Sequence, residues 1–438
     1  MVKYDNVLII GSGGREHCLG WKISQSAKVK KIFFAPGNGG TETNVPIAMD
    51  DLNRLRQFAK DNSCLTVVGP ERPLALGIVN VFEEYELPIF GPSKKSSRLE
   101  WSKVYAKQFM NKYGIPTAPF STFSDAGEAE QYVNSLPDPP VIKVDGLAQG
   151  KGVVVSANCD DAINAIRNFT SRNNSKKDHV RVIVENRLYG NEISFIALCD
   201  GSSIMPLVSS QDHKRANDND LGPNTGGMGA FSPIPFINSE LYHKIVKRII
   251  DPTLHGLKDS GTRFKGFLYA GLMIEQETKE PYVLEFNVRM GDPECQSIMT
   301  RMKSDLVDYL EATIEGTLSS KSPIEWKQDC AVCVVMASRG YPGKYETGKV
   351  IYGLDATLGN DVYVFHSGTI KDKQNRLITN GGRVLSVTGM GPDLRTASNR
   401  AYSAVKNIHW GNDEEYYRND IGYKALQVNK TGPHSHSL

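Results

Sequence analysis

The sequence predicts a multidomain protein of mixed class, α/β in its first part and α+β in the rest. Two observations support this prediction. In the first hundred residues, short apolar stretches alternate with helical patterns and end in Gly, Pro, Asn or Glu, which favours a parallel sheet with ligands at the carboxyl ends of its strands. After Trp326, short strands and turns with many glycines predict a separate small α+β or barrel-like domain.

Length and composition narrow the class of protein. The chain has 438 residues, more than one ordinary core needs, so we expect about two to four domains. Its 40% hydrophobic and 23% charged residues are typical of soluble globular proteins, and a net charge of +2 argues against nucleic acid as a main partner. We find neither the apolar run of ~18–20 residues that spans a bilayer nor a signal-peptide pattern. Seven scattered cysteines do not resemble a disulfide framework, so the expected setting is the cytoplasm.

The N-terminal region is expected to form the parallel sheet, with strands at 6–10, 31–35, 65–68 and 87–92. The first strand ends in Gly11-Ser-Gly-Gly-Arg-Glu-His17, where glycines would let backbone N–H groups approach a phosphate at the start of a helix. This is not the G-x-G-x-x-G fingerprint of dinucleotide binding, because the sixth position is Glu16 and the second strand lacks a terminal acidic residue. We predict a site for a mononucleotide-sized phosphate, with a merely tight turn as the alternative.

The remaining elements follow in chain order. Helices are expected at 102–113, 239–260, 305–317 and 395–408, and strands around 141–144, 153–155, 180–185, 193–198, 270–274 and 282–288. A Gly-, Asn- and Asp-rich loop is expected over 211–233, and a loop of that length inside a compact domain is usually functional. Cys330 and Cys333 lie in an apolar strand pattern without a second pair or nearby histidines, so we interpret them as core residues.

A hairpin in the middle of the chain is typical of phosphate contacts. Asp145-Gly-Leu-Ala-Gln-Gly-Lys-Gly152 lies between two expected strands, and a Gly-rich hairpin with a lysine can close over phosphates. It departs from the G-x-x-x-x-G-K-[ST] loop, since Gly152 stands at the hydroxyl position and no helix follows. Lys143, between apolar residues of the preceding strand, requires a buried anion or an exit to solvent. An ordinary hairpin is the alternative.

Further polar residues follow in two places. Glu185 and Glu192 flank a turn after a strand and can accept hydrogen bonds from a nucleoside, although surface carboxylates are the alternative. The motifs Gln211-Asp-His-Lys-Arg215 and Gly222-Pro-Asn-Thr-Gly-Gly-Met-Gly229 combine charge with accessible backbone amides. That combination favours anion binding or a mobile lid, and a solvated charge run is the alternative.

The strand that begins at Val283 has a polar face. Because side chains of a strand alternate, Glu285, Asn287 and Arg289 point the same way. Two oxygen donors and a guanidinium on an otherwise apolar strand are costly to bury without partners. Mg²⁺ held against phosphate would satisfy them, because carboxylate and amide oxygens suit the metal and arginine suits the anion. A surface strand with a chance polar face is the alternative.

Taken together, these motifs resemble the ATP-grasp superfamily. The shared order is a lysine that opens a helix, a strand lysine, a Gly-rich hairpin, a pair of glutamates and a late Glu-x-Asn; here these are Lys103, Lys143, residues 145–152, Glu185 with Glu192, and Glu285 with Asn287. Finer motifs are similar to those of the phosphoribosylamine–glycine ligase family, at 11–17, 36–38, 69–71, 145–152, 211–215, 222–229 and 285–294. Together they are specific, although none is specific alone. Small departures at residues 186, 187, 189, 288 and 290 leave the ligand positions intact.

The resemblance implies a division into domains. A Rossmann-like domain, of the kind that precedes an ATP-grasp fold, would cover residues 1–102. The ATP-grasp domain would cover 103–325, with a lid at about 120–190, and a small mixed α/β barrel-like domain would cover 326–426. The tail at 427–438 is expected to be disordered.

The resemblance also implies an activity. ATP, glycine and 5-phosphoribosylamine would be converted through glycyl phosphate into glycinamide ribonucleotide, ADP and phosphate, the second step of purine biosynthesis. ATP would be the co-substrate and Mg²⁺ or Mn²⁺ the metal. The partners would be these small molecules rather than nucleic acid or a membrane, and the chain would be a monomer or a weak homodimer.

Roles for individual residues follow from the same resemblance. ATP would be held by Lys103, Lys143, Gly146, Gly150, Lys151, Gly152, Glu185, Leu188 and Glu192, and the metal by Glu285 and Asn287. The sugar phosphate of phosphoribosylamine would be held by Gly13, Gly14, Arg15, Asn38 and Glu71. The glycine and the transferred phosphoryl group would be surrounded by the catalytic candidates Asp212, Lys214, Arg289 and Asp292.

Three other interpretations stay open. The first is another ATP-grasp ligase or carboxylase, of purine or biotin metabolism, against which the motif at 222–229 argues. The second is a non-catalytic nucleotide-binding module, which the presence of Lys143, Glu285 and Asn287 disfavours. The third is a dinucleotide-dependent oxidoreductase, which the missing acidic residue after the second strand disfavours.

Overall fold

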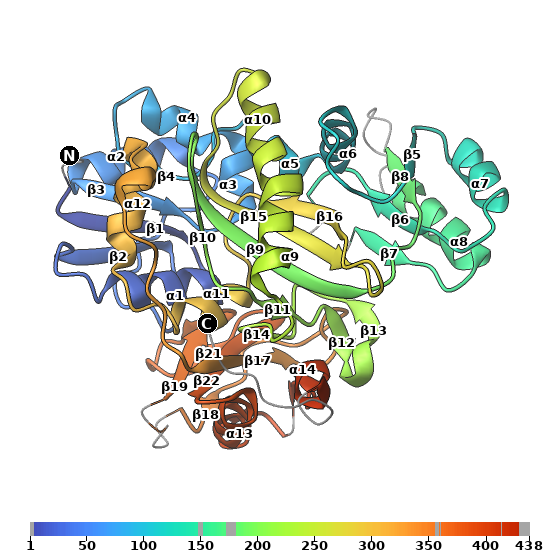
Figure 1. Ribbon diagram of the computed structural model, residues 1–438. Coiled ribbons are helices and arrows are strands. Elements are labelled where there is room, and N and C mark those ends of the chain that lie inside the picture. Colours follow the sequence, from blue (N-terminus) through green and yellow to red (C-terminus); the bar gives the residue numbers. More distant parts are fainter. Residues whose placement is uncertain are drawn as a thin grey trace.

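The N-terminal sheet is parallel, as the sequence predicts. The computed structural model describes residues 4–147, 152–171, 181–354, 359, 361–412 and 414–428 (Figure 1). Its first sheet has the order β2-β1-β3-β4. The strands are β1 (Asn6–Gly11), β2 (Lys31–Pro36), β3 (Cys64–Val68) and β4 (Ile89–Phe90), and the helices between them are α1 (Gly14–Ile23), α2 (Leu52–Asp61), α3 (Glu71–Leu76) and α4 (Ile78–Glu83). All of β3 is buried, the pattern of a parallel strand covered on both faces.

Two antiparallel sheets form the middle of the chain. The first of them has the order β10-β9-β15-β16 and consists of β9 (Asn191–Asp200), β10 (Ile204–Pro206), β15 (Lys265–Ile274) and β16 (Pro281–Asn287). The second has the order β5-β8-β6-β7, made of β5 (Phe120–Phe123), β6 (Val141–Val144), β7 (Val153–Val155) and β8 (Val182–Glu185). With α7 (Ala126–Asn134) and α8 (Cys159–Ser171) it has a hydrophobic cluster of its own, and Figure 1 shows it at the side of the molecule away from the N-terminal sheet.

The expected helices of the middle region are present. Those that pack near the sheets are α5 (Arg98–Trp101), α6 (Lys103–Lys112), α9 (Ser239–Ile245), the π-helical η2 (Val246–Ile250), α10 (Asp251–Asp259), α11 (Glu294–Met299), α12 (Leu306–Glu315) and the 3-10 turn η3 (Leu318–Ser320). The side chain of Ser102 accepts a hydrogen bond from Tyr105 N, which explains why α6 begins at Lys103. The expected helix at 239–260 is continuous through α9, η2 and α10, with a π turn inside it.

The third sheet joins the C-terminal region to the expected loop at 211–233. Its order is β11-β14-β17-β22-β19, with β24 beside β17. The strands are β11 (Gln211–Asp212), β14 (Gly229–Ser232), β17 (Cys330–Ser338), β19 (Val362–His366), β22 (Arg383–Gly391) and β24 (Glu415–Tyr416). Between its two sheet strands the loop folds into the hairpin β12 (Arg215–Asn217), η1 (Asp218–Asp220) and β13 (Leu221–Asn224). The long loop is thus structured, because strand pairing satisfies its backbone polar groups.

The rest of the C-terminal region covers this sheet. The expected late helix is α13 (Leu394–Val405), which packs on β17 and β22, and the short elements are β18 (Ile351–Tyr352), β20 (Thr369–Lys371), β21 (Leu377–Thr379), β23 (His409–Trp410) and α14 (Tyr423–Val428). Cys333 is fully buried in β17, in agreement with its interpretation as a core residue. Among the described residues, no helix combines the length and apolar character needed to cross a membrane.

Candidate active site

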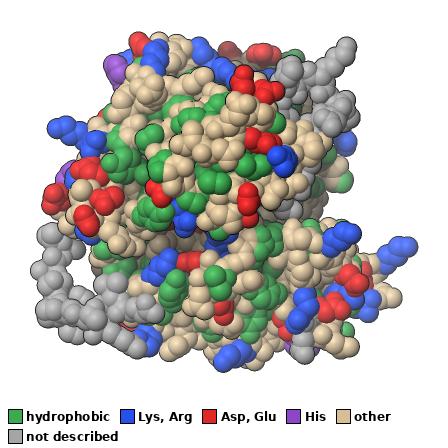
Figure 2. Space-filling view, turned by 90° about the vertical axis from the view of Figure 1, so that its right-hand side faces the viewer, with side chains coloured by type: hydrophobic (Ala, Val, Ile, Leu, Met, Phe, Trp, Pro, Cys, Tyr) green, Lys and Arg blue, Asp and Glu red, His purple; other side chains and the backbone are tan. Residues whose placement is uncertain are grey.

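One cavity of ≈840 Å³ gathers residues from all three regions of the chain. Figure 2, in which the right-hand side of Figure 1 faces the viewer, shows a hollow across the molecule with Lys and Arg side chains inside it. Most of the residues predicted from the sequence line the cavity, namely Gly13, Arg15, Glu71, Lys103, Lys143, Gly152, Glu185, Leu188, Glu192, Asp212, Lys214, Glu285, Asn287, Arg289 and Asp292. Gly14, Asn38 and Gly146 do not line it, and Gly150 and Lys151 lie outside the described residues.

A buried carboxylate lies between two lysines on the ATP-grasp side of the cavity. Glu185, at the end of β8, pairs with Lys143 Nζ at 2.5 Å through Oε1 and with Lys107 Nζ at 2.6 Å through Oε2. Lys143 also donates to the carbonyl of Leu284 at 2.9 Å. Of the two possibilities for this mid-strand lysine, a buried anion or an exit to solvent, the structure has the buried anion, Glu185. Burial lowers the pKa of Lys107 to about 8, although Glu185 opposes this shift. We did not identify Lys107 from the sequence; its only signal is that it lies one helical turn after Lys103.

The hairpin that follows Lys143 is tied to the start of α6. Lys103 Nζ donates to the carbonyl of Gly146 at 2.8 Å, and burial lowers the pKa of Lys103 even though Glu285 raises it. Asp145 accepts hydrogen bonds from Ser102 Oγ at 3.1 Å and pairs with Arg181 at 2.5 Å. These contacts place the first residues of the hairpin beside the cavity. The hairpin tip, residues 148–151, lies outside the described residues.

Glu285 and Asn287 point to the same side of β16, as strand alternation predicts. Burial would raise the pKa of Glu285, but the ammonium groups of Lys214, Lys143 and Lys103 lower it to about 2, so this carboxylate is ionised at neutral pH. The carboxylate and the Asn287 amide oxygen form an all-oxygen donor set, which suits Mg²⁺ or Mn²⁺. Among the described residues no group of three or more His, Cys, Asp and Glu side chains could hold a metal by itself. The two residues therefore fit a cation that takes its remaining ligands from phosphate oxygens and water.

Arg289 lies in an ion-pair network with two glutamates. Its Nη2 is 2.8 Å from Glu100 Oε1 and its Nε is 3.5 Å from Glu71 Oε2, while Nη2 also donates to Asn287 Oδ1 at 3.0 Å. Burial raises the pKa of Glu100, which Arg289 opposes. Burial alone would raise the pKa of Glu71, but the positive charges of Arg289 and Arg15 outweigh this effect and lower it below its usual value. Glu100, at α5, was not identified from the sequence because only the fold brings it to β16.

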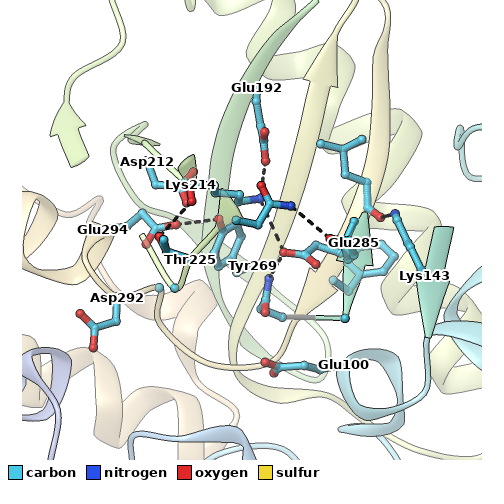
Figure 3. Close-up of a pocket in the computed structure, with 18 of the residues that line it drawn as sticks. Glu100, Lys143, Glu192, Asp212, Lys214, Thr225, Tyr269, Glu285, Asp292 and Glu294 are labelled. Atoms are coloured by element: carbon cyan, nitrogen blue, oxygen red, sulfur yellow. Dashed lines mark hydrogen bonds and ion pairs between the residues drawn. The ribbon is translucent and has the colours of Figure 1, made fainter. Parts of the chain in front are cut away.

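Lys214 lies between two of the predicted carboxylates, as Figure 3 shows. Its Nζ pairs with Glu192 and is 3.7 Å from Glu285 Oε1. Burial would lower the pKa of Lys214, but Glu192, Asp212 and Glu285 raise it well above its usual value. Burial raises the pKa of Asp212, and Lys214 only partly opposes that effect. The backbone of Thr225 donates to the carbonyl of Lys214 at 2.7 Å, so the two loop motifs lie against each other.

Arg383, a residue of β22 in the C-terminal sheet, contacts Asp292. We did not identify Arg383 from the sequence. Arg383 Nη1 donates to the carbonyls of Asp292 at 2.6 Å and Gly226 at 2.7 Å, and Nη2 lies 3.4 Å from Asp292 Oδ2. Burial raises the pKa of Asp292, but Arg383 and Arg15 lower it below its usual value. Tyr341 and Tyr345 line the same wall, and Tyr341 accepts a hydrogen bond from Gly226 N at 3.1 Å.

A buried hydrogen-bonded pair, Tyr269 and Glu294, was also not identified from the sequence. The hydroxyl of Tyr269 donates to Glu294 Oε1 at 2.6 Å, and Ser194 Oγ donates to the same oxygen at 3.1 Å. Both Tyr269 and Glu294 line the cavity.

The glycine turn after β1 differs from the expectation of free phosphate-binding amides. Gly13 N donates to Glu16 Oε2 at 2.6 Å, and Arg15 Nε lies 2.5 Å from Glu16 Oε1. The carboxylate of Glu16 therefore occupies the turn, and the N–H of Gly13 is used within the protein. Asn38 donates to the carbonyls of Ser12 at 3.0 Å and His366 at 2.7 Å, so its amide group links the turn to the C-terminal region.

Similar proteins were found for nearly the whole chain. Family models of phosphoribosylglycinamide synthetase match with the N domain at residues 5–100, the ATP-grasp (A) domain at 101–295 and the C domain at 331–424. Phosphoribosylamine–glycine ligase from Allochromatium vinosum is 46% identical over 96% of this chain and 98% of its own length, and the one from Vibrio vulnificus strain YJ016 has the same identity and coverage.

Solved structures of similar proteins support the same family. The crystal structure of phosphoribosylamine–glycine ligase from Thermotoga maritima has a TM-score of 0.81 and 36% identity, covering 95% of this chain and 100% of that one. A biotin carboxylase from Campylobacter jejuni has a TM-score of 0.69 at 14% identity, covering 98% and 97%, and so shows only a shared fold. With its glycine-turn, hairpin and Glu-x-Asn residues gathered around one cavity and all three family models matched, the chain belongs to the phosphoribosylglycinamide synthetase family, an ATP-grasp family whose relatives are named phosphoribosylamine–glycine ligase.

Proposed function

We propose that this chain joins glycine to 5-phosphoribosylamine with ATP as the phosphoryl donor, giving glycinamide ribonucleotide, ADP and phosphate. The observation that carries the proposal is the single cavity lined by ATP-grasp residues such as Lys143 and Glu285, by Arg15 and Glu71 of the N-terminal region, and by Arg383 of the C-terminal sheet. The names of the relatives support the same reaction. Phosphoryl transfer needs positioning and charge neutralisation more than a protein nucleophile, and the lining is rich in charged groups.

ATP would lie between α6, β6 and the turn after β8. Lys103, Lys143 and the hairpin with Gly146, Gly150, Lys151 and Gly152 are assigned to its phosphates; Glu185, Leu188 and Glu192 are assigned to its adenosine. Because Glu185 is already bound by two lysines, its carboxylate is held in one orientation before the nucleotide arrives. Such preorganisation favours binding, since little side-chain freedom is lost.

Glu285 and Asn287 are assigned to the metal. When bound, Mg²⁺ or Mn²⁺ would neutralise charge on the β- and γ-phosphates. The low pKa of Glu285, about 2, keeps its oxygens available as acceptors at neutral pH.

The chemistry would proceed in two steps. A carboxylate oxygen of glycine attacks the γ-phosphorus, the bond from that phosphorus to the oxygen of the β-phosphate breaks, and ADP leaves. The amine nitrogen of phosphoribosylamine then attacks the acyl carbon of glycyl phosphate, phosphate leaves, and the nitrogen loses a proton. Lys214 and Arg289 line the cavity, and their positive charge would stabilise the transferred phosphoryl group. Asp212 and Asp292 would orient glycine and the attacking amine.

The sugar phosphate would lie on the side of the N-terminal sheet. Arg15 and Glu71 line this part of the cavity, and Gly13, Gly14 and Asn38 belong to the loops that shape it. The division into domains at 1–102, 103–325 and 326–426, with a lid at about 120–190, remains part of this proposal. So do a cytoplasmic setting and a monomer or weak homodimer.

The test is ADP release by the purified chain with ATP, a divalent metal, glycine and freshly generated 5-phosphoribosylamine. We expect stoichiometric ADP and glycinamide ribonucleotide only when all substrates are present. Each substrate and the metal are omitted in turn as controls. ADP release that is independent of glycine, or that requires bicarbonate instead, would favour another ATP-grasp ligase or carboxylase and contradict the proposal.

A further inference from the structure

A segment near the end of the chain holds the loop that carries Asp212 and Lys214. We call residues 416–424 the clamp segment, and it contacts the hairpin β12–β13 about two hundred residues earlier in the sequence. Its contacts with residues 213–220 include Arg418 Nη1 to Asp220 Oδ1 at 2.9 Å, Arg418 Nη1 to the carbonyl of Arg215 at 3.1 Å, Asn219 N to Asp420 Oδ2 at 2.7 Å, Asn419 N to Asp218 Oδ1 at 2.8 Å, Gly422 N to His213 Nε2 at 3.1 Å, Tyr416 OH to the carbonyl of Ala216 at 2.8 Å, and Lys424 Nζ to Asp220 Oδ2 at 2.6 Å.

Arg418 is the centre of these contacts. Its side chain is completely buried, with a relative exposure of 0%. Nε and Nη2 form a two-pronged contact with Asp420 at 2.7 and 2.8 Å, and Nη1 contacts Asp220. A guanidinium presents its donors in a fixed planar fork, so it sets the geometry of both carboxylates at once, which a lysine cannot do.

The hairpin tip needs such support. Asn219 and Asp220 have positive φ angles of 60° and 55°, in the left-handed region that side chains other than glycine adopt at an energetic cost. A backbone of this kind persists only where its surroundings hold it. Here both residues contact the clamp segment, Asn219 through its N–H and Asp220 through its carboxylate.

The stretch of chain that leads into the hairpin, residues 211–215, lines the cavity. Figure 3 shows Asp212 and Lys214 on the cavity side, with Lys214 between Glu192 and Glu285. His213 lies between them in the chain, and its Nε2 accepts the hydrogen bond from Gly422 N in the clamp segment. Because His213 is the chain neighbour of both Asp212 and Lys214, the contact of its ring with the clamp segment restrains the backbone from which these two side chains extend.

We propose that Arg418 is a positioning residue for the ligation reaction: through the hairpin β12–β13 it holds Lys214 and Asp212 at the end of the cavity where glycine is phosphorylated. The substrate named here rests on the proposed function. Arg418 itself does not line the cavity, whereas Lys214, Asp220 and Lys424 do. The C-terminal region thereby acts on the chemical site without contributing the reacting groups.

The experiment compares Arg418→Met and Arg418→Lys in the full-length chain, with Arg400→Met as the matched control. Arg400 is also an arginine of the C-terminal region in an ion pair, with Asp361 at 2.8 Å, but its side chain is 40% exposed and does not reach the hairpin. Two quantities are measured: hydrogen exchange of the backbone amides at 213–225, and the KM and kcat for glycine and for ATP.

For Arg418→Met we expect exchange at 213–225 to be about tenfold faster, because the hairpin opens locally. The kcat/KM for glycine should fall about tenfold, while the KM for ATP should change by less than about twofold. Arg418→Lys should fall between this variant and the wild type, and Arg400→Met should match the wild type. Unchanged exchange in Arg418→Met would overturn the proposal, and so would equal losses for ATP and glycine, which indicate general destabilisation.

Tyr416→Phe decides the matter if Arg418→Met does not fold. This change removes only the hydroxyl that donates to the carbonyl of Ala216. We expect faster hydrogen exchange at the hairpin and a raised KM for glycine. Wild-type values for both in that variant would overturn the proposal. The exchange measurement needs no turnover, so a wild-type chain without ligase activity would contradict the proposed function while the effect of Arg418 on the hairpin is still judged.

Discussion

Lys107 Nζ lies 2.6 Å from Glu185 Oε2, and each of these side chains is only 3% exposed although both line the cavity. Glu185 is therefore paired from two sides, by α6 through Lys107 and by β6 through Lys143. Removing one partner of such a buried pair leaves charge without compensation, which is more harmful than the loss of an exposed ion pair.

Lys107→Met is expected to weaken ATP binding. The variant leaves Glu185 with one lysine, so we expect a loss of about 3 kcal/mol in the free energy of unfolding and a KM for ATP raised about tenfold. Chemical denaturation and steady-state kinetics measure the two effects. Lys112→Met, on the same helix with a side chain 65% exposed, serves as the control. An unchanged KM for ATP would show that Lys107 has no part in the nucleotide site.

Glu285→Ala should abolish ADP formation while the protein stays folded. The side chain supplies the only carboxylate of the proposed metal pair, and its loss should reduce kcat at least about a hundredfold. Binding of Mn²⁺ in the presence of ATP, followed by electron paramagnetic resonance, should weaken in parallel. Glu277→Ala changes an exposed glutamate of the β15–β16 turn and should leave both quantities unchanged. Normal turnover of the Glu285→Ala variant would refute the metal assignment.

Gly227→Ala should impair turnover through a steric clash. Gly227 has a φ of +107°, and an added Cβ would lie 2.5 Å from Cδ of Pro293, next to Asp292. Gly316→Ala is the matched control, because Gly316 has a φ of +77° with open space around the added carbon. We expect Gly316→Ala to cost about 1 kcal/mol of unfolding free energy with full activity, and Gly227→Ala to lower kcat/KM about tenfold or more. Equal behaviour of the two variants would assign the whole effect to backbone strain.

Stability should fall as the pH is lowered below 6.5. Burial lowers the pKa of three histidines: His17 to about 3, and His366 and His213 each to about 4. A neighbouring basic group lowers each pKa further, namely His366 for His17, Lys371 for His366 and Arg418 for His213. The native state keeps these rings neutral while the unfolded chain takes up protons below pH 6.5, so their stabilising contribution is complete above pH 6.5 and is lost as the pH falls toward 4.

Between pH 7.5 and 5.0 the loss should be about 2 kcal/mol for each histidine, measured by urea denaturation at both pH values. His366→Gln should make the pH dependence less steep by roughly one such contribution. His255→Gln, at an exposed position, leaves the buried set intact and is the control. A free energy of unfolding that is the same at both pH values would mean that these rings are protonated in the folded state.

Local patterns in the sequence were sufficient for several structural features. The alternation of strands and helices predicted the parallel N-terminal sheet, and the period of two along β16 placed Glu285 and Asn287 on one face. A lysine in the middle of an apolar strand required a buried anion or an exit to solvent, and the structure has the buried anion, Glu185. The family, and with it the ATP-grasp fold, could be recognised because its motifs are short and contiguous in the chain. The roles given to the individual site residues stay predictions.

Two other features differ from what the sequence predicted. The glycine turn predicted as an open phosphate site is filled by Glu16, because a carboxylate two positions after Gly14 reaches back to Gly13 N when the helix forms. The loop expected at 211–233 is largely a hairpin between sheet strands, because its backbone groups pair with β17 and with the clamp segment. The first is a local contact at the start of a helix, which the spacing of Gly13 and Glu16 allows, whereas the second depends on partners far away in the chain.

The sequence by itself determined the order of the elements, the family and the residues of the short motifs, because these depend on side-chain periodicity and on neighbours within a few positions. Only the tertiary structure decided which charges meet. Glu100 with Arg289, Arg383 with Asp292 and Arg418 with Asp220 are separated by 90 residues or more in the chain, and each pair forms because tertiary packing brings distant segments together. Buried charges need partners within hydrogen-bond reach, and the chain can supply these from any distance along the sequence.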